Sequence, residues 1–180
     1  YLIKMIVSDQ PAKSKILCIG VGTGSEIIEL SSEFPQFSFV AVEPSKAMLD
    51  VCKERLIDMG ISERCQLIQG YIGDVPLEEK FDVVLCILVM HHTPIKERQD
   101  ILDGVVNHLK PNGYFINVEI SHDIKSPTFD DILEKWKELS KRSGATEEKL
   151  KILPQMMKDH LHIQSPEDIE AMLKTSGFKD

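Results

Sequence analysis

Short apolar runs alternate with amphipathic stretches along most of the chain. The apolar runs are rich in β-branched residues and lie at residues 16–19, 37–42, 65–69, 81–88 and 113–120. Runs of this length predict strands that are buried on both faces of a sheet. Between them the apolar residues recur at helical spacing, as in the segments 25–34 and 46–56, and Ser45 can cap the second of these helices. Lys110-Pro-Asn-Gly113 predicts a turn before the fifth strand. Regular alternation of strands and helices predicts an α/β fold, with a parallel sheet covered by helices on both faces.

The first predicted strand leads into a loop that contains Gly20, Gly22 and Gly24. Glycine permits backbone torsions and close approaches that a Cβ would block, so this loop could pass directly against a ligand. Most of the contacts would come from the main chain, including that of Val21. The same glycines would also suit a tight turn from strand to helix that binds nothing.

An acidic residue, Glu43, closes the second predicted strand about 20 residues after the glycine loop. A carboxylate at this place can accept hydrogen bonds from both hydroxyls of an unphosphorylated ribose. Two nucleoside cofactors compete for this arrangement. The dinucleotide pattern G-x-G-x-x-G needs a glycine at position 25, where this chain has Ser25. The pattern here is G-x-G-x-G, which favours S-adenosylmethionine over NAD because it resembles motif I of the class I S-adenosylmethionine-dependent methyltransferases.

The chain resembles that family from Ile16 to Phe178 in the order and spacing of its segments. These are ILCIGVGTG, FVAVEPSKAMLDVCKERL, CQLIQGYIGDVPLEEKFDVVLCILVMHHT, HLKPNGYFINVEI and MLKTSGFKD. The resemblance implies a Rossmann-like sheet, S-adenosyl-L-methionine as the cofactor and methyl transfer as the activity. It also implies cofactor contacts at Gly20, Val21, Gly22, Gly24, Glu43, Pro44, Tyr71, Ile72 and Ile87.

One position departs from the family pattern. After the third strand the family commonly has Gly-Asp, with the aspartate on the adenine amino group, whereas this chain has Gly70-Tyr71 and its aspartate, Asp74, comes three positions late. The Tyr71 ring could stack on the purine while the Ile72 backbone meets a ring nitrogen. Alternatively, Tyr71 is a surface aromatic with no contact to the cofactor.

Residues 121–163 form an insertion that we expect to be a helical lid and to determine substrate choice. Helical spacing predicts one helix over 128–142 and a second, capped by Thr146, that reaches residue 158. The only tryptophan, Trp136, lies in the first of them, and we expect it in the core rather than stacked on substrate.

The layout of the insertion resembles the subfamily that includes carboxy-S-adenosylmethionine synthase of transfer RNA modification. Such an enzyme needs a cation for the carboxylate of its modified cofactor, and arginine is the natural partner. Residues 143–180 contain no arginine, so we expect a methyltransferase with a small-molecule acceptor. A synthase-like or transfer RNA-modification enzyme and a non-catalytic cofactor-binding scaffold remain the alternatives.

No catalytic residue is assigned. His91 and His92 follow the fourth strand, and imidazole suits general base catalysis, but methyl transfer draws much of its rate from positioning. We therefore expect packing or capping roles for this pair. The cysteines at 18, 52, 65 and 86 lie in apolar patterns without a C-x-x-C motif, so we expect buried thiols and no metal site.

Composition and net charge limit the classes of partner that the chain is expected to bind. The chain has 180 residues, 42% of them hydrophobic, and a net charge of −8. This charge argues against nucleic acid, and no apolar run is long enough for a membrane span. We expect a single cytoplasmic domain over residues 1–180 that lacks the family's last two strands, either as a fragment or with its sheet completed by a homo-oligomer.

Overall fold

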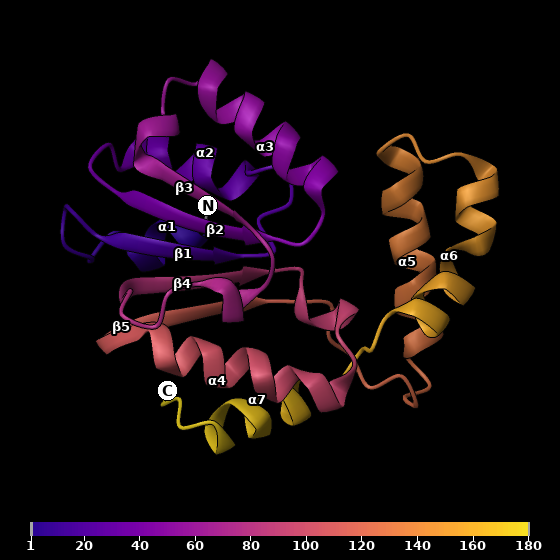
Figure 1. The fold of residues 1–180 in the computed structure, drawn as a ribbon. Coiled ribbons are helices and arrows are strands. Elements are labelled where there is room, and N and C mark those ends of the chain that lie inside the picture. Colours follow the sequence, from indigo (N-terminus) through magenta and orange to yellow (C-terminus); the bar gives the residue numbers. More distant parts are fainter. Residues whose placement is uncertain (1, 180) are drawn as a thin grey trace. The chain divides into compact units, whose positions relative to one another are not determined.

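The computed structural model describes residues 2–179 and contains a five-stranded parallel sheet. The sheet lies in the first of two compact units, which runs to Val89 and includes Asp100–Val118. Its order is β3-β2-β1-β4-β5 (Figure 1). The strands are β1 Lys15–Ile19, β2 Ser38–Glu43, β3 Cys65–Gln69, β4 Phe81–Ile87 and β5 Leu109–Val118. The predicted parallel α/β sheet is thus confirmed.

Helices connect the strands and bury both faces of the sheet. They are α1 Leu2–Val7, α2 Ser25–Glu33, α3 Lys46–Asp58 and α4 Arg98–His108, of which α4 begins in the second unit. On one face, Ile16 and Phe39 pack with residues of α2 and α3 such as Ile27 and Leu56. The alternate strand residues are equally buried: Leu17, Val40 and Val84 are at most 1% exposed. This burial explains why the strands are apolar runs and not alternating patterns.

Local signals place the helix starts next to the sheet. The Ser45 hydroxyl accepts a hydrogen bond from the Met48 amide at 3.4 Å, which confirms it as the cap of α3. By contrast, α2 follows Gly24, which has a φ of 79° and no side-chain cap. A Cβ at Gly24 would lie 2.6 Å from the Cys52 sulfur of α3. Glycine is therefore needed both for the turn and for the close packing of α2 on α3.

The segment Lys110–Gly113 corrects one expectation. The sequence predicts a turn there and a strand that starts at Gly113, whereas β5 starts at Leu109. Leu109 pairs with Phe81, the register then shifts, and pairing resumes between Val83 and Tyr114. Asn112 has a φ of 62° inside this irregular stretch. The turn residues are thus accommodated as a bulge-like irregularity, because pairing with β4 continues on both sides of them.

The second unit comprises Met90–Gln99 and the chain from Glu119 onward. Its helices are α5 Phe129–Arg142, α6 Glu147–His160 and α7 Pro166–Thr175. The two predicted helices of the insertion are present, and Thr146 caps α6 by accepting the Lys149 amide. A small core of Phe129, Leu133, Met157 and Ile163 holds this unit together. The prediction of a single domain over residues 1–180 stays a prediction.

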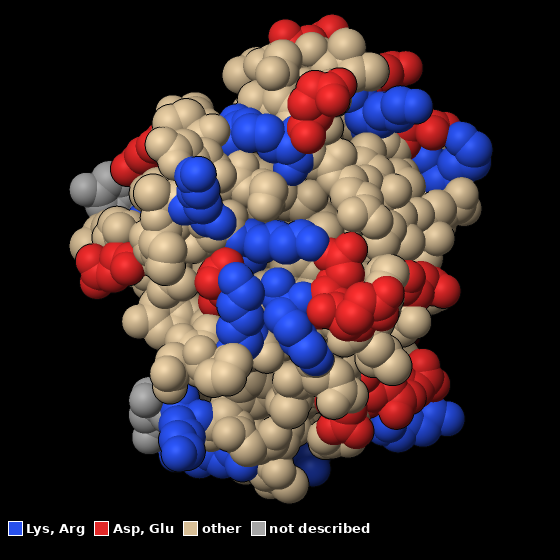
Figure 2. Space-filling model, turned by 60° about the vertical axis from the view of Figure 1, so that its left-hand side comes forward, with Lys and Arg blue, Asp and Glu red and all other residues tan. Residues whose placement is uncertain are grey.

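Charged side chains of both signs are interspersed on the surface. Figure 2 shows one face on which Lys and Arg lie beside Asp and Glu and among uncharged residues. In the first unit, Lys110 pairs with Asp82 at 2.9 Å and Lys15 pairs with Glu79. This face therefore carries no uninterrupted basic surface. Among the helices that the structure describes, none combines the length and the apolar character that crossing a membrane requires.

Candidate cofactor site

The glycine loop lies at the place where the order of the sheet reverses. β1 pairs with β2 on one side and with β4 on the other, so the connections leave β1 and β4 in opposite directions. In open parallel sheets, ligands bind at the carboxyl ends of the strands next to this switch point. The loop after β1 and residues 87–89 at the end of β4 meet there. The first unit by itself therefore provides a candidate ligand site.

Backbone hydrogen bonds hold the loop against β2. The amides of Gly20 and Val21 both donate to the Val42 carbonyl, at 2.9 and 3.2 Å. Gly20 has a φ of 62°, and a Cβ there would lie 2.6 Å from a methyl group of Val89. The missing side chain therefore lets the end of β4 approach the loop. At Gly22, a Cβ would meet no described atom within 4 Å, so the space above the middle of the loop is open.

Glu43 links the glycine loop to the start of α3. Its Oε2 accepts the Gly22 amide and its Oε1 accepts the Ser45 amide, both at 2.9 Å. The side chain is held rigidly, because Glu43 is only 6% exposed. Each carboxylate oxygen has two lone pairs, so each can still accept one further hydrogen bond. The predicted ribose residue thus offers two oriented acceptors, and the next residue, Pro44, is exposed.

The end of β3 has an arrangement that sequence reasoning missed. The Asp74 carboxylate turns back and accepts the Tyr71 amide at 2.8 Å. A Cβ at Gly70 would collide with this carboxylate, which explains the glycine. The Tyr71 side chain is 69% exposed, whereas Ile72 is 6% exposed and its side chain lies against Gly104. An aspartate three residues after the start of a turn is a capping signal that could have been recognised.

The end of β4 contains a backbone outlier. Ile87 is half-buried, as expected for a residue beside a site, and the next residue, Leu88, has a φ of 59°. Its amide donates to the Val118 carbonyl at 2.6 Å, and its side chain is 51% exposed. A branched residue in the left-handed region is strained, and such strain clusters at functional sites. No sequence signal indicates this conformation, because leucine rarely adopts it.

A second acidic residue, Glu26, lies close to the loop in the first turn of α2. Burial, followed by the nearby Glu43 charge, raises the pKa of Glu26 to about 7, while Arg55 opposes the rise. Arg55 itself donates to the Thr23 carbonyl at 2.7 Å, within the loop. Glu26 is therefore partly protonated near neutral pH, unlike an exposed glutamate.

The four cysteines are thiols, of which three are buried as predicted and Cys65 is not. Cys18, Cys52 and Cys86 are buried, Cys65 is half-buried, and all four are free. Burial raises the pKa of Cys52 to about 11, so this thiol is protonated and unreactive near neutral pH. In the part of the chain that the structure describes, no group of three His, Cys, Asp or Glu side chains is arranged to hold a metal ion.

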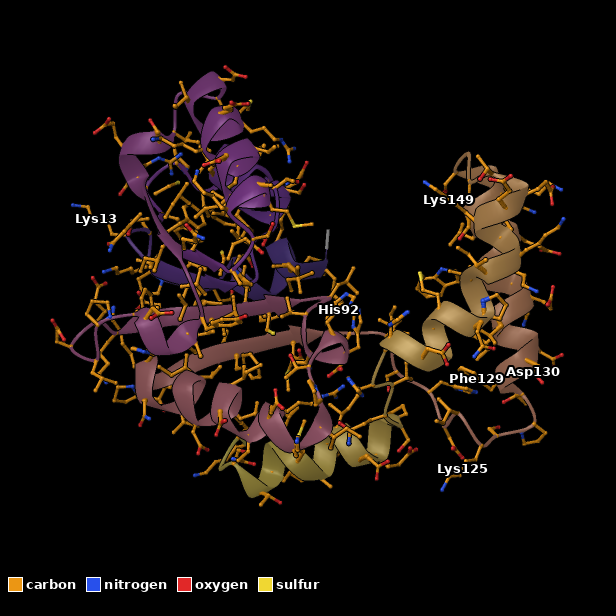
Figure 3. The ribbon with its side chains drawn as sticks, turned by 45° about the vertical axis from the view of Figure 1, so that its right-hand side comes forward. Lys13, His92, Lys125, Phe129, Asp130 and Lys149 are labelled. Carbon is orange, nitrogen blue, oxygen red and sulfur yellow. The ribbon has the colours of Figure 1, made fainter. Side chains whose placement is uncertain are left out.

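The two adjacent histidines belong to the second unit and differ from each other. His91 is 2% exposed, and its Nδ1 accepts the Ile120 amide at 3.4 Å. Burial, with smaller contributions from His92 and Arg98, lowers the pKa of His91 to about 4. His91 is therefore a neutral packing residue, whereas His92 is exposed. Figure 3 labels His92 beside the turn that follows β4.

A buried ion pair between Arg98 and Glu119 joins distant segments of the second unit. Arg98 is fully buried and its guanidinium lies 3.3 Å from the Glu119 carboxylate, which is 3% exposed. The same guanidinium donates to the Gln164 side chain at 2.6 Å and to the Thr93 carbonyl at 3.2 Å. Arg98 thereby connects three segments of the second unit that are far apart in sequence. Nothing in the sequence distinguishes it from a surface arginine near the start of a helix.

Comparison with known proteins identifies curated relatives of the chain. A carboxy-S-adenosyl-L-methionine synthase of Campylobacter lari is 26% identical over 98% of this chain and 74% of its own length. A ubiquinone biosynthesis O-methyltransferase of Rickettsia prowazekii is 24% identical over 76% of this chain and 52% of its own length. Several other curated relatives are matched over only 35 to 42% of their length, so the chain spans about a third to a half of them.

A solved structure shares the fold. The phosphoethanolamine N-methyltransferase 2 of Haemonchus contortus, in complex with S-adenosyl-L-methionine, has a TM-score of 0.67 and 21% identity. The match covers 99% of this chain and 36% of that one. The family described as "Methyltransferase domain" matches residues 16–113, more than half of the chain and the segment that contains every predicted cofactor residue. The chain therefore belongs to the methyltransferase domain family, as its glycine loop and the acidic residue at the end of β2 indicate.

Proposed function

We propose that this chain is an S-adenosyl-L-methionine-dependent methyltransferase that acts on a small-molecule acceptor. The observation that carries the proposal is the Glu43 carboxylate, which is fixed by the Gly22 and Ser45 amides and keeps one free acceptor site on each oxygen. A ribose diol presents two hydroxyl donors side by side, which matches this pair of acceptors. An unphosphorylated ribose is required, since a phosphate there would meet a carboxylate.

The remaining predicted contacts surround the same place in the first unit. Gly20, Val21, Gly22 and Gly24 would present the main chain to the cofactor, beside the exposed Pro44. S-adenosyl-L-methionine would supply a methyl group activated by its sulfonium, and in-line attack on the methyl carbon by an acceptor would release S-adenosylhomocysteine. The chain's own role is to bind and to orient, because no described residue is needed as a base for an acceptor that is already nucleophilic.

Adenine recognition would come from Tyr71 and Ile72. The Tyr71 ring is 69% exposed, so one face is free to stack on a purine. Asp74 fixes the turn that carries Tyr71, because its Oδ2 accepts the Tyr71 amide. At the other end of the cofactor, Ile87 and the strained Leu88 would provide an apolar wall for the methionine portion.

A small molecule is the acceptor that the charge of the chain favours. The net charge of −8 would repel transfer RNA or DNA, whose binding depends on Lys and Arg contacts to phosphate. The ubiquinone biosynthesis O-methyltransferases among the relatives are named for a small-molecule pathway. We also propose that the protein is cytoplasmic, because free cysteines such as these four are typical of a reducing compartment. The edge strands β3 and β5 could in addition pair with a second copy of the chain.

The second candidate is carboxy-S-adenosyl-L-methionine synthesis, which the match over nearly the whole chain favours. That activity requires a cation for the added carboxylate. The arginines of this chain are largely committed: Arg55 binds the Thr23 carbonyl, Arg64 the Phe37 carbonyl at 2.8 Å, and Arg98 is buried with Glu119. Arg142 is exposed in the last turn of α5. Among the arginines that the structure describes, no buried one is free for a carboxylate, so the methyltransferase proposal is preferred.

Calorimetry tests the proposal. The full chain should bind S-adenosyl-L-methionine and S-adenosylhomocysteine but not NAD, and Glu43→Ala should weaken both by at least about tenfold, as expected for hydrogen bonds to a charged group. Glu54→Ala, at an exposed carboxylate on α3, is the matched control. Unchanged affinity in Glu43→Ala would contradict the ribose assignment.

Mass spectrometry and turnover separate the alternatives. A co-purified nucleoside heavier by one carboxylate would favour the synthase. Formation of S-adenosylhomocysteine with a small-molecule extract would exclude the non-catalytic scaffold, while binding without any turnover would favour it.

A further inference from the structure

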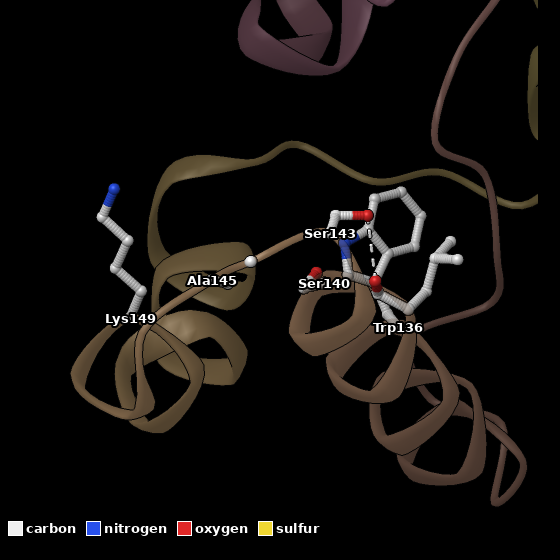
Figure 4. Close-up of a pocket in the computed structure, with 7 residues that line it drawn as sticks. Trp136, Ser140, Ser143, Ala145 and Lys149 are labelled. Carbon is white, nitrogen blue, oxygen red and sulfur yellow. Dashed lines mark hydrogen bonds between the residues drawn. The ribbon is translucent and has the colours of Figure 1, made fainter.

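A groove lies where the end of α5 turns into the start of α6. It has a volume of about 430 Å³ and is lined by Trp136, Leu139, Ser140, Ser143, Ala145 and Lys149 (Figure 4). Small-molecule sites typically occupy about 300–1,000 Å³. Every lining residue belongs to the second unit, and none belongs to the proposed cofactor site. The groove is therefore a candidate site in its own right.

One wall of the groove is apolar. The apolar stripe of α5 begins with Phe129 and Leu133, which are 4% and 3% exposed in the small core. Further along the same helix, Trp136 is 36% exposed and Leu139 is 62% exposed. The expectation that Trp136 is a core residue is therefore wrong, because the core covers only the first half of the stripe. The indole and the leucine instead offer an uncovered surface on which a flat ring could stack.

The floor and the opposite side of the groove are polar. Figure 4 shows Ser140, Ser143 and Ala145 between Trp136 on one side and Lys149 on the other. The Ser143 hydroxyl donates to the Leu139 carbonyl at 3.1 Å, drawn as the dashed line, so its lone pairs remain available to accept. A ligand with a hydroxyl donor would satisfy them.

Lys149 provides the charge. Its backbone amide donates to the Thr146 hydroxyl at 3.4 Å, which fixes the first turn of α6 and the origin of the side chain. The neighbouring Glu147 is paired with Lys141 at 3.0 Å. In the described part of the chain, no carboxylate lies within 4 Å of the Lys149 ammonium. Figure 3 labels Lys149 at the end of the α5–α6 hairpin opposite to Phe129, away from the small core.

We propose that this groove binds a small aromatic carboxylate. The aromatic ring stacks on Trp136 beside Leu139, and the carboxylate extends past Ser143 to pair with Lys149. The indole surface favours a ligand with an aromatic ring, and the lysine at the opposite side favours a ligand with a negative charge. The proposal goes beyond methyl transfer and stands without it, because the lining shares no residue with the cofactor site.

The single tryptophan makes the groove directly observable, since all indole fluorescence of the chain comes from Trp136. The probe is 4-hydroxybenzoate, titrated into the full chain. We expect a saturable change in fluorescence below about 10 mM, the range reached by ligands of this size. The neutral analogue 4-hydroxybenzamide has the same ring and hydroxyl, and it should bind at least about tenfold more weakly because it lacks the charge.

Variants of Lys149 and Trp136 measure the contribution of each residue to the affinity separately. Lys149→Met should weaken 4-hydroxybenzoate by about tenfold and leave 4-hydroxybenzamide unchanged. Lys151→Met, at an exposed lysine of the same helix, is the matched control and should change neither. Trp136→Phe, measured by calorimetry, should retain most of the affinity, whereas Trp136→Ala should abolish measurable binding. Circular dichroism of each variant verifies that the helices are intact.

Three results would overturn the proposal. The first is no saturable signal with 4-hydroxybenzoate, and the second is equal affinity for the acid and the amide. The third is a fluorescence change that follows protein concentration alone, which would mean that a second copy of the chain covers the groove. Because S-adenosyl-L-methionine binding is measured separately, failure here leaves the proposed function intact, and failure of cofactor binding leaves this inference intact.

Discussion

Glu26 should make the stability of the chain fall as the pH rises from about 4.5 to about 7. Burial and the nearby Glu43 raise the pKa of Glu26 from 4.5 to about 7 in the folded chain. In the unfolded chain the carboxyl titrates near its ordinary value. The folded state therefore holds a proton between these two values that the unfolded state has already released. Stability is fully present below about pH 4.5 and is lost progressively up to about pH 7.

The magnitude follows from the size of the pKa change. Each tenfold change in a protonation equilibrium corresponds to about 1.4 kcal/mol. Raising the pKa from 4.5 to about 7 thus corresponds to about 3 kcal/mol. The Glu26 residue is partly exposed, and solvent screening lowers the expected effect to about 2–3 kcal/mol. Glu26→Gln, which is neutral at every pH, should show this gain at pH 8 and almost none at pH 4.

Urea denaturation of both proteins from pH 4 to pH 8.5 measures the difference. Taking the difference between variant and parent removes the contributions of all other titrating groups. Glu54→Gln, at an exposed carboxylate on α3, controls for the substitution itself. If the free energy difference between Glu26→Gln and the parent does not change with pH, Glu26 is not a buried proton acceptor and the reasoning fails.

Three further predictions concern His91, Leu88 and Arg98. Burial lowers the pKa of His91 from 6.5 to about 4, so His91 contributes stability above about pH 6.5 that is lost as the pH falls toward 4; His91→Asn should reduce this acid-side loss, measured by urea denaturation. Leu88→Asn should raise the free energy of unfolding by about 0.5–1 kcal/mol by relieving the left-handed strain, while Leu77→Asn, at another exposed leucine, should not; equal effects would remove the strain argument. Arg98→Met leaves the buried Glu119 carboxylate without its cation and should cost about 3–5 kcal/mol, with partial recovery in Arg98→Met/Glu119→Gln; a double-mutant cycle with no coupling would contradict the ion pair.

Sequence reasoning predicted the glycine loop more completely than the other parts of the site. The three glycines and Glu43 are separated by a distance in sequence that only a strand–helix–strand unit explains, so their spatial meeting followed from the pattern. The structure adds that Glu43 accepts the Gly22 and Ser45 amides, a contact that residue spacing alone does not specify. The cap by Ser45 was predictable because it involves residues three positions apart.

Other features could not be predicted because they depend on which distant segments meet. Arg98 is buried only because Glu119 and Gln164 converge on it from elsewhere in the chain. Trp136 was misassigned to the core because a helical stripe shows which face is apolar and not how far along the helix a partner covers it. The segment Lys110–Gly113 was read as a simple turn because its pairing with β4 is not a local property.

The sequence by itself determined the parallel α/β architecture, the glycine loop, the position of Glu43 beside that loop and the caps of α3 and α6. These depend on apolar periodicity and on contacts between residues close together along the chain, where few conformations compete. Only the tertiary structure decided the raised pKa of Glu26, the strained backbone of Leu88, the burial of Arg98 and the exposed groove beside Trp136. Burial, charge proximity and strain arise from packing between segments that are distant in sequence, and so they exist only after the chain has folded.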